Sequence, residues 1–291
     1  MHKKRNSPVH RILVKACKAA SALFPENHML RVTEYAVRSE RLPAAFDGFR
    51  ILQLSDLHSA GFGRDNVRLL QKIETAKPDI IVMTGDMVSR SDSDRHVFFR
   101  LAETLGKTYP CYYVIGNHEQ DMARGELKSF LARLAALRIR VLDNERVSLK
   151  RGEQSISLYG MWFSLKYYRE ANLRSGHTAK FTDRDMKRLL GAFDPSHYGI
   201  LLTHSPLCFP VYARWGADLT LCGHVHGGMI RLPFLGGLLS PEREFFPKYS
   251  AGIYKEDGGT LLVSRGLGSG VFGARILNIP EIAVVTLRNK V

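Results

Sequence analysis

Five short segments of the chain carry side chains that bind metal ions. They are Asp56-Leu57-His58, Gly85-Asp86, Gly116-Asn117-His118-Glu119, the single His204, and Gly223-His224-Val225-His226. Their carboxylate, amide and imidazole groups offer oxygen and nitrogen ligands, and no cysteine is among them. This donor set favours Mn, Fe, Zn, Ni or Co, and it does not fit the all-oxygen shell usual for Ca²⁺.

Seven such side chains can fill the shells of two metal ions if one carboxylate bridges the ions. Two ions about 3.5–4 Å apart clamp a phosphate and make a water acidic enough to attack it at neutral pH. His118 follows directly after a candidate ligand, so it can instead face the substrate and donate a proton to the leaving oxygen. The residue types therefore favour hydrolysis of a phosphate ester.

Each of the five segments follows a short apolar run that reads as a β-strand. The runs are Phe49–Leu54, Ile80–Thr84, Tyr112–Ile115, Ile200–Thr203 and Leu219–Cys222. In open α/β sheets, ligands bind at the carboxyl ends of the strands. A glycine precedes the candidate ligand in three of the five cases, which suits sharp turns and a close approach of the backbone. The pattern predicts one metal site at one sheet edge.

Amphipathic stretches alternate with these runs, which predicts an α/β fold. Helices are expected over 66–77, 94–107 and 124–137, and further strands over 155–159, 260–264 and 282–287. Residues 233–259 are rich in glycine, proline and aromatic side chains, and we expect loops and turns around the site there. The simplest division is an N-terminal arm over residues 1–40 and one catalytic domain over residues 41–291.

The ordered segments resemble the motifs of the calcineurin-like metallophosphoesterases, namely D-x-H, G-D, G-N-H-[DE], H and G-H-x-H. The resemblance spans about residues 41–287. It implies a two-sheet α/β sandwich flanked by helices, and two divalent metal ions. By the same resemblance, the first ion is held by Asp56, His58, Asp86 and His226, with Asp86 bridging, and the second is completed by Asn117, His204 and His224. His118 matches the catalytic histidine of the family.

Within that family, the chain is most similar to membrane-associated bacterial phosphoesterases. The similarity rests on Leu42-Pro43 before the first strand and on the late segments of residues 249–252 and 264–268. It also rests on the segment Gly227-Gly228-Met229-Ile230-Arg231, in which the subgroup has Gln in place of Met229. Relatives in this subgroup cleave the pyrophosphate of UDP-2,3-diacylglucosamine in lipid A synthesis. The resemblance therefore implies a phosphate ester or pyrophosphate substrate. The alternative that these relatives offer is a lipid-linked substrate, UDP-2,3-diacylglucosamine.

Charge is unevenly distributed along the chain, which has 42 Lys and Arg against 28 Asp and Glu and a net charge of +14. Residues 3–18 hold six basic side chains and no acid, and apolar residues of 12–24 fall on one helical face. A basic amphipathic helix over residues 3–24 can lie on an anionic membrane surface, or it can pack on its own domain. We expect a cytoplasmic protein, peripheral at the inner face of the membrane.

Other classes of function have less support. The positive charge permits a nucleic-acid-binding protein or nuclease, but no aromatic–basic platform accompanies it, and no specific nucleic acid is expected. An inactive scaffold is not favoured, because no candidate ligand is missing.

Several side chains near the motifs have two interpretations. Glu119 can polarise His118 or be an exposed acid at a helix start. Three arginines can bind a substrate phosphate or can only solubilise the surface. Two groups of aromatic and apolar side chains can line a substrate cleft or can pack inside the protein. The arginines are Arg231, Arg265 and Arg275; the aromatic groups are Trp162, Phe163, Tyr167 and Tyr168, and the loop side chains Phe234, Leu235, Leu238, Leu239, Phe245 and Phe246.

Overall fold

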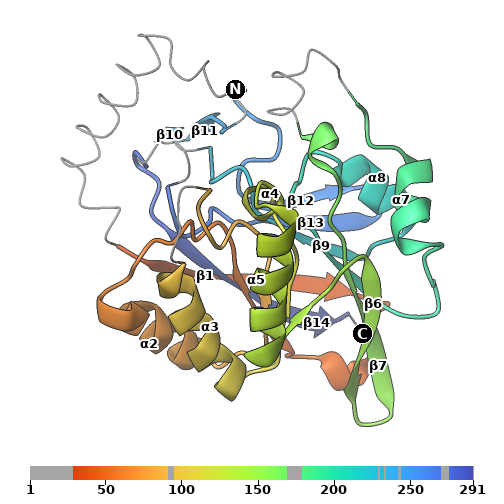
Figure 1. Cartoon of the computed structure of the whole chain (residues 1–291). Helices are drawn as coiled ribbons and strands as arrows, with labels where there is room; N and C mark the ends of the chain where they lie inside the picture. Colours follow the sequence, from red (N-terminus) through yellow and green to blue (C-terminus); the bar gives the residue numbers. More distant parts are fainter. Residues whose placement is uncertain are drawn as a thin grey trace.

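Two six-stranded β-sheets pack face to face with helices outside them (Figure 1). The computed structural model describes residues 29–90, 95–168, 179–228, 230–232, 234–241, 244–269 and 275–290. The two-sheet sandwich flanked by helices, expected from the sequence, is confirmed.

The first sheet has the strand order β1-β14-β2-β3-β4-β5. β14 runs parallel to β1 and antiparallel to β2, and β2 to β5 are parallel to one another. The strands are β1 (Arg31–Ser39), β14 (Glu281–Asn289), β2 (Arg50–Leu54), β3 (Ile80–Met83), β4 (Cys111–Tyr113) and β5 (Ile139–Val141).

The second sheet has the order β12-β13-β9-β8-β7-β6. Its four central strands are parallel, and the two outer strands are antiparallel to their neighbours. The strands are β12 (Gly252–Glu256), β13 (Gly259–Val263), β9 (Leu219–Cys222), β8 (Gly199–Leu202), β7 (Gln154–Gly160) and β6 (Glu145–Arg151).

Three hydrophobic layers hold the sandwich together. Side chains alternate across each strand, so Ile51 of β2 faces the second sheet while Leu52 and Leu54 face the helices of the first. α2 (Val67–Ala76), α3 (His96–Thr108) and α5 (Arg124–Ala136) cover the outside of the first sheet. α7 (Asp183–Leu190) and α8 (Phe209–Trp215) cover the outside of the second sheet.

The strands and helices predicted around the motifs are present, with ends that differ by a few residues. The sequence analysis did not identify β1, β5, β6, α7 or α8. β1 lies within residues 1–40, so the boundary drawn at residue 40 follows a strand of the first sheet. Residues 1–28, which include the expected amphipathic helix over 3–24, lie outside the described residues.

The stretch 233–259, expected to be loops and turns, contains two strands. One of them, β11 (Gly236–Leu239), forms a small separate hairpin with β10 (Ile230–Leu232), which lies just before the stretch. The other, β12, belongs to the second sheet. In the part of the chain that the structure describes, no helix has the length and apolar character needed to span a membrane.

A glycine inside α3 tests how tightly the outer layer is packed. A Cβ atom at Gly106 would lie 1.9 Å from the carbonyl oxygen of Leu137, after α5. Gly106→Ala should gain about 1 kcal/mol of helix propensity. The clash with backbone outweighs that gain, so we expect the free energy of unfolding to fall by about 1–3 kcal/mol. Urea denaturation measures it.

Gly125 in α5 is the matched control, because a Cβ there would meet no atom within 4 Å. Gly125→Ala should leave stability unchanged or raise it by up to about 1 kcal/mol. If both variants were equally stable, the contact between α3 and the chain after α5 would be looser than described.

Candidate metal centre

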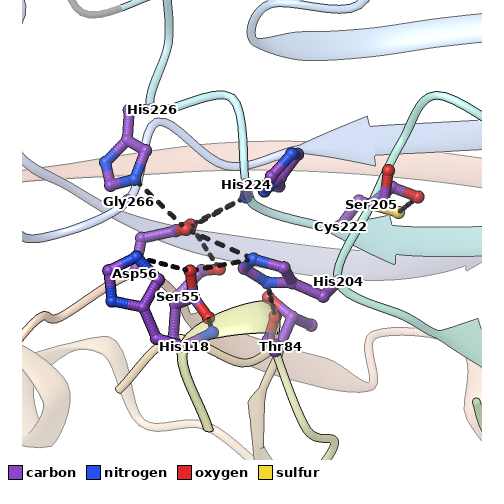
Figure 2. A network of polar contacts seen from close by, with 12 residues as sticks. Ser55, Asp56, Thr84, His118, His204, Ser205, Cys222, His224, His226 and Gly266 are labelled. Carbon is purple, nitrogen blue, oxygen red and sulfur yellow. Dashed lines mark hydrogen bonds and ion pairs between the residues drawn. The ribbon is translucent and has the colours of Figure 1, made fainter. Parts of the chain in front are cut away.

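The structure brings all seven candidate ligands and His118 to one edge of the sandwich. Asp56 and His58 follow β2, Asp86 follows β3, and Asn117 and His118 open the short helix α4 (Asn117–Gln120) after β4. The second sheet contributes His204 after β8 and His224 and His226 after β9. Figure 2 shows several of these side chains converging from both sheets. All eight side chains are buried or nearly so.

The backbone at this edge is strained. Asp56, His58, Asp86, His224 and His226 have φ between 47° and 70°. Residues other than glycine seldom adopt this left-handed region, which costs about 1–3 kcal/mol at each position and persists only where the surrounding structure enforces it. Such strain is concentrated at functional sites, and here it turns successive side chains towards one point.

Backbone amides fix the two carboxylates. The amide of His224 donates to Asp56 at 3.0 and 3.1 Å, and that of His118 donates to Asp86 Oδ1 at 2.7 Å. Glycine is needed beside each carboxylate, because a Cβ at Gly116 or at Gly223 would lie 2.2 Å from a carboxylate oxygen. The two G-N-H and G-H-x-H motifs therefore hold the acids in place as well as supplying ligands.

Three overlapping groups of these side chains have donor atoms close enough to share metal ions. They are Asp56–His58–His226, His58–Asp86–His118 and Asp86–His204–His224, each with its atoms within 4.8 Å of one another. Asp86 is common to two of the groups, and its Oδ2 lies 3.2 Å from His204 Nε2 and 3.9 Å from His58 Nε2. Its carboxylate is therefore central to the cluster.

The histidine tautomers fit a metal centre. His204 Nδ1 lies 2.7 Å from the carbonyl of Thr84, and His226 Nδ1 lies 3.2 Å from that of Gly268. A carbonyl only accepts, so each Nδ1 carries a proton, and in the neutral ring each Nε2 presents a lone pair to a carboxylate. His226 Nε2 is 3.5 Å from Asp56 Oδ1. Lone pairs facing carboxylates require a positive charge between them.

Electrostatics point to the same requirement. Burial alone would lower the pKa of His204, but the adjacent Asp86 and the nearby Asp56 raise it to about 10. Burial lowers the pKa of His58 and of His226, which keeps both rings neutral. The carboxylates therefore stabilise a cation at this point, either a proton on His204 Nε2 or a metal ion in its place, whereas the rings of His58 and His226 remain available as ligands.

The amide of Asn117 has a similar surrounding. Its side-chain oxygen lies 3.0 Å from His204 Nε2, 3.1 Å from His224 Nδ1 and 3.3 Å from Asp86 Oδ2, while its nitrogen faces Arg90. With the amide turned over, the nitrogen would donate to these three atoms and the oxygen would accept from Arg90. The Asn117 amide therefore lies against Asp86, His204 and His224, where its oxygen, when turned inward, can join them as a ligand.

His118 has the opposite tautomer. Its Nδ1 accepts from the backbone amide of Arg90 at 3.3 Å, so its proton is on Nε2, which lies 3.9 Å from Asp86 Oδ2. Burial lowers its pKa to about 3, so the ring is neutral. A ring that presents N–H where its neighbours present lone pairs is arranged to donate a proton and not to bind a cation.

Sequence reasoning missed the role of Glu119. Its buried carboxylate accepts from the amides of Asp86 and Met87 at 2.9 Å, of Gly116 at 2.8 Å and of Val88 at 3.4 Å. It is therefore not an exposed acid at a helix start, and its oxygens are used by the backbone and not by His118. The carboxylate ties the loop after β3 to the loop after β4.

Arg275 lies inside the fold, so it is neither open to a phosphate nor a group that solubilises the surface. Its buried guanidinium donates to the carbonyls of Asn278 at 2.8 Å, Gly268 at 2.5 Å and Arg265 at 2.6 Å. Arg275 therefore supports the loop whose Gly268 carbonyl orients His226. Phe163 and Tyr168 are also internal, because they pack on the outer face of the second sheet.

Comparison with known proteins assigns the fold and the site to a family. The family model described as calcineurin-like phosphoesterase matches residues 49–228, which contain every candidate ligand. The chain belongs to this family. It is accordingly a metal-dependent phosphoric ester hydrolase, and a nucleic-acid-binding protein is not favoured.

Similar metallophosphoesterases align over nearly their whole length. The protein YkuE of Bacillus subtilis is 28% identical over 272 residues, which is 92% of this chain and 89% of YkuE. A metallophosphoesterase of Aquifex aeolicus is 30% identical over 91% of this chain and 94% of its own. The UDP-2,3-diacylglucosamine pyrophosphatase LpxG of Chlamydia trachomatis is 26% identical over 89% of this chain and 90% of its own.

Glu119 provides a test of how the loops support the metal centre. Glu119→Gln keeps the shape but places an amide N–H against backbone N–H groups. We expect a loss of about 3 kcal/mol or more in the free energy of unfolding, because charge-assisted hydrogen bonds are lost and buried donors remain unpaired. Metal content measured by elemental analysis should also fall, because Asp86 is no longer held in position.

The control is Glu126→Gln, on the exposed side of α5, where the acid pairs with Arg95. It should leave metal content and thermal stability unchanged, since exposed ion pairs contribute little. Full metal loading of Glu119→Gln would show that the backbone alone positions Asp86.

Proposed function

We propose that the chain is a dinuclear hydrolase of a phosphate ester or pyrophosphate. Asp56, His58, Asp86 and His226 would hold one ion, and Asn117, His204 and His224 would complete the shell of a second ion shared through Asp86. The central position of the Asp86 carboxylate between the histidines of both sheets is the observation that carries this proposal. The donor set suits Mn, Fe, Zn, Ni or Co.

The side chains divide the work between binding and proton transfer. When bound, two divalent ions would supply the positive charge that clamps the phosphate and acidifies the attacking water. His118 Nε2–H faces the same space as the ligands and donates to the leaving oxygen. To act as an acid, the ring must first bind a second proton at Nδ1, in place of the Arg90 amide. An adjacent phosphate anion favours this imidazolium form, and the neutral ring returns once the Nε2 proton has been transferred.

A lipid-linked pyrophosphate is the substrate alternative with support from a relative. LpxG is named for hydrolysis of UDP-2,3-diacylglucosamine, and its similarity covers 89% of this chain. We take this class of substrate as the finer proposal and phosphate-ester hydrolysis as the broader one.

The basic N-terminal arm provides a second link to lipid. Six basic side chains within residues 3–18, without an acid, attract the arm to an anionic membrane surface. The proposed location is the cytoplasmic face of the membrane, where residues 3–24 make peripheral contact. This electrostatic contribution decreases as salt concentration rises.

Asp86→Asn tests the dinuclear centre. The substitution removes the charge that both groups of ligands share, so bound metal should fall and most activity should be lost while the fold remains. The measurements are elemental analysis and hydrolysis of aryl phosphate monoesters, aryl diesters, UDP-2,3-diacylglucosamine and DNA by protein reconstituted with each metal.

Asp65→Asn is the matched control, because that carboxylate is exposed and far from the ligand groups. A fully loaded and fully active Asp86→Asn protein would exclude the two-metal proposal. Hydrolysis of the aryl diesters without UDP-2,3-diacylglucosamine would retain the phosphoesterase and exclude the lipid alternative.

His118→Ala separates proton transfer from metal binding. Both ions should remain bound, and turnover should fall by about 10²–10⁴-fold, the usual contribution of a general acid. The loss should be smaller for aryl esters whose leaving groups need no proton. A missing metal ion in the elemental analysis would instead identify His118 as a ligand.

A further inference from the structure

The β10–β11 hairpin and the chain segments beside it expose a cluster of large apolar side chains. Phe234 is fully exposed, and Phe245, Leu235, Phe246 and Leu277 are 68%, 66%, 56% and 44% exposed. Eight large hydrophobic side chains are exposed in the described part of the chain, and five of them lie in this cluster. Contiguous apolar exposure of this kind marks an interaction surface.

Backbone contacts join these residues into one surface, which we call the apolar hairpin. Leu239 forms a bridge with Phe245, and the amide of Phe246 donates to the carbonyl of Leu238 at 2.9 Å. On the other side, Ile230 forms a bridge with Ile276, next to Leu277. The exposed side chains are therefore held near one another by the fold.

The apolar hairpin is attached directly to the loop that carries His226. A Cβ on Gly228 would lie 2.6 Å from the Cα of Gly237, so the two backbones touch. Arg231 Nη1 donates to the carbonyl of Gly227 at 2.8 Å, and Asn278 Nδ2 donates to that of His226 at 2.6 Å. Whatever binds the hairpin is therefore held next to the metal centre.

The local backbone conformation does not favour bulky apolar residues at three positions of the apolar hairpin. Phe234 has φ 65°, Phe246 φ 51° and Leu277 φ 52°, a region in which glycine or asparagine would be less strained. Bulky apolar residues at these positions are costly both in backbone strain and in exposure to water. Burial against an apolar partner outside the folded chain would offset both costs.

The basic arm enters the fold close to this surface. β1 begins at Arg31, which pairs with Glu281 and donates from its amide to the carbonyl of Pro280 at 2.9 Å. Pro280 is three residues after Leu277 of the apolar hairpin. Residues 1–28, with six basic side chains and no acid before residue 19, therefore lead into a strand that meets the chain three residues after Leu277.

We infer that the apolar hairpin inserts into the headgroup region of an anionic lipid bilayer and holds the metal centre against it. The apolar tip supplies burial, and the basic arm that joins at the same edge supplies charge complementary to anionic headgroups. A second copy of the chain is disfavoured as the occupant, because the two arms would repel. The inference rests on the proposed function only for its consequence, that the substrate is a membrane lipid.

Flotation with lipid vesicles tests the inference on the full chain. The vesicles contain phosphatidylcholine alone or with phosphatidylglycerol, at low and high salt. Wild type should bind the anionic vesicles and keep a salt-resistant fraction. The double variant Phe234→Ser/Phe245→Ser should lose at least about tenfold in partition coefficient, because each ring no longer leaves water. Its remaining binding should disappear at high salt.

The matched control removes two exposed apolar side chains elsewhere, Val67 on α2 and Ile253 on β12, which are 45% and 38% exposed. Val67→Ser/Ile253→Ser should bind like wild type. Circular dichroism and metal-dependent hydrolysis of a water-soluble aryl diester should be unchanged in both double variants, because neither pair belongs to the metal centre.

Three results would overturn the inference. They are equal vesicle binding by Phe234→Ser/Phe245→Ser and wild type, no binding by wild type, and a wild-type dimer in sedimentation that the double variant lacks. Failure of the proposed function is a separate outcome. If wild type bound vesicles through the hairpin but hydrolysed no phosphate ester, docking would stand and the enzymatic proposal would fall.

Discussion

The structure depends on two buried carboxylates that the fold places where its two sheets meet. Asp56 and Asp86 come from the first sheet, and the histidines that face them come from both sheets. Burying two anions is unfavourable unless charge and hydrogen bonds compensate. Amides of His224 and His118 supply part of the compensation, and the raised pKa of His204 shows that the remaining field favours a cation. The strained turns and glycines around the carboxylates maintain that arrangement.

Hydrogen bonds between the imidazole rings and the backbone determine the tautomer of each histidine, and therefore its chemical role. His204 and His226 give Nδ1–H to backbone carbonyls and turn lone pairs inward, whereas His118 accepts an amide at Nδ1 and turns N–H inward. Identical side chains therefore acquire different chemistry from backbone groups outside the cluster. The Glu119 carboxylate acts on the same principle one layer further out, since it fixes the loops from which Asp86 and His118 project.

The sequence predicted the elements that lead into the metal centre because both faces of those strands are buried. Such strands read as continuous apolar runs, and parallel strands bring their carboxyl ends to one edge. β1 and β6 were missed because they are edge strands with alternating charged residues, as in Glu145–Arg151. Glu119 was misjudged because its partners, the amides of Asp86 to Val88, are distant in sequence. Nor does composition reveal that Phe234 faces water while Phe163 is buried.

The apolar hairpin can orient the metal centre at a membrane, which the N-terminal arm cannot do, because the hairpin follows closely after a metal ligand in the chain. Electrostatic attraction through the arm raises the concentration of enzyme near a membrane, but this attraction does not set the direction in which the metal centre faces. The hairpin begins four residues after His226 and contacts that loop through Gly228 and Arg231. In a lipid, the phosphate lies at headgroup depth, close to the acyl chains. A docking element joined rigidly to a metal ligand therefore fixes the distance and the orientation of the metal centre relative to the lipid phosphate. Binding energy accelerates a reaction most effectively when it is used to position the reacting groups in this way.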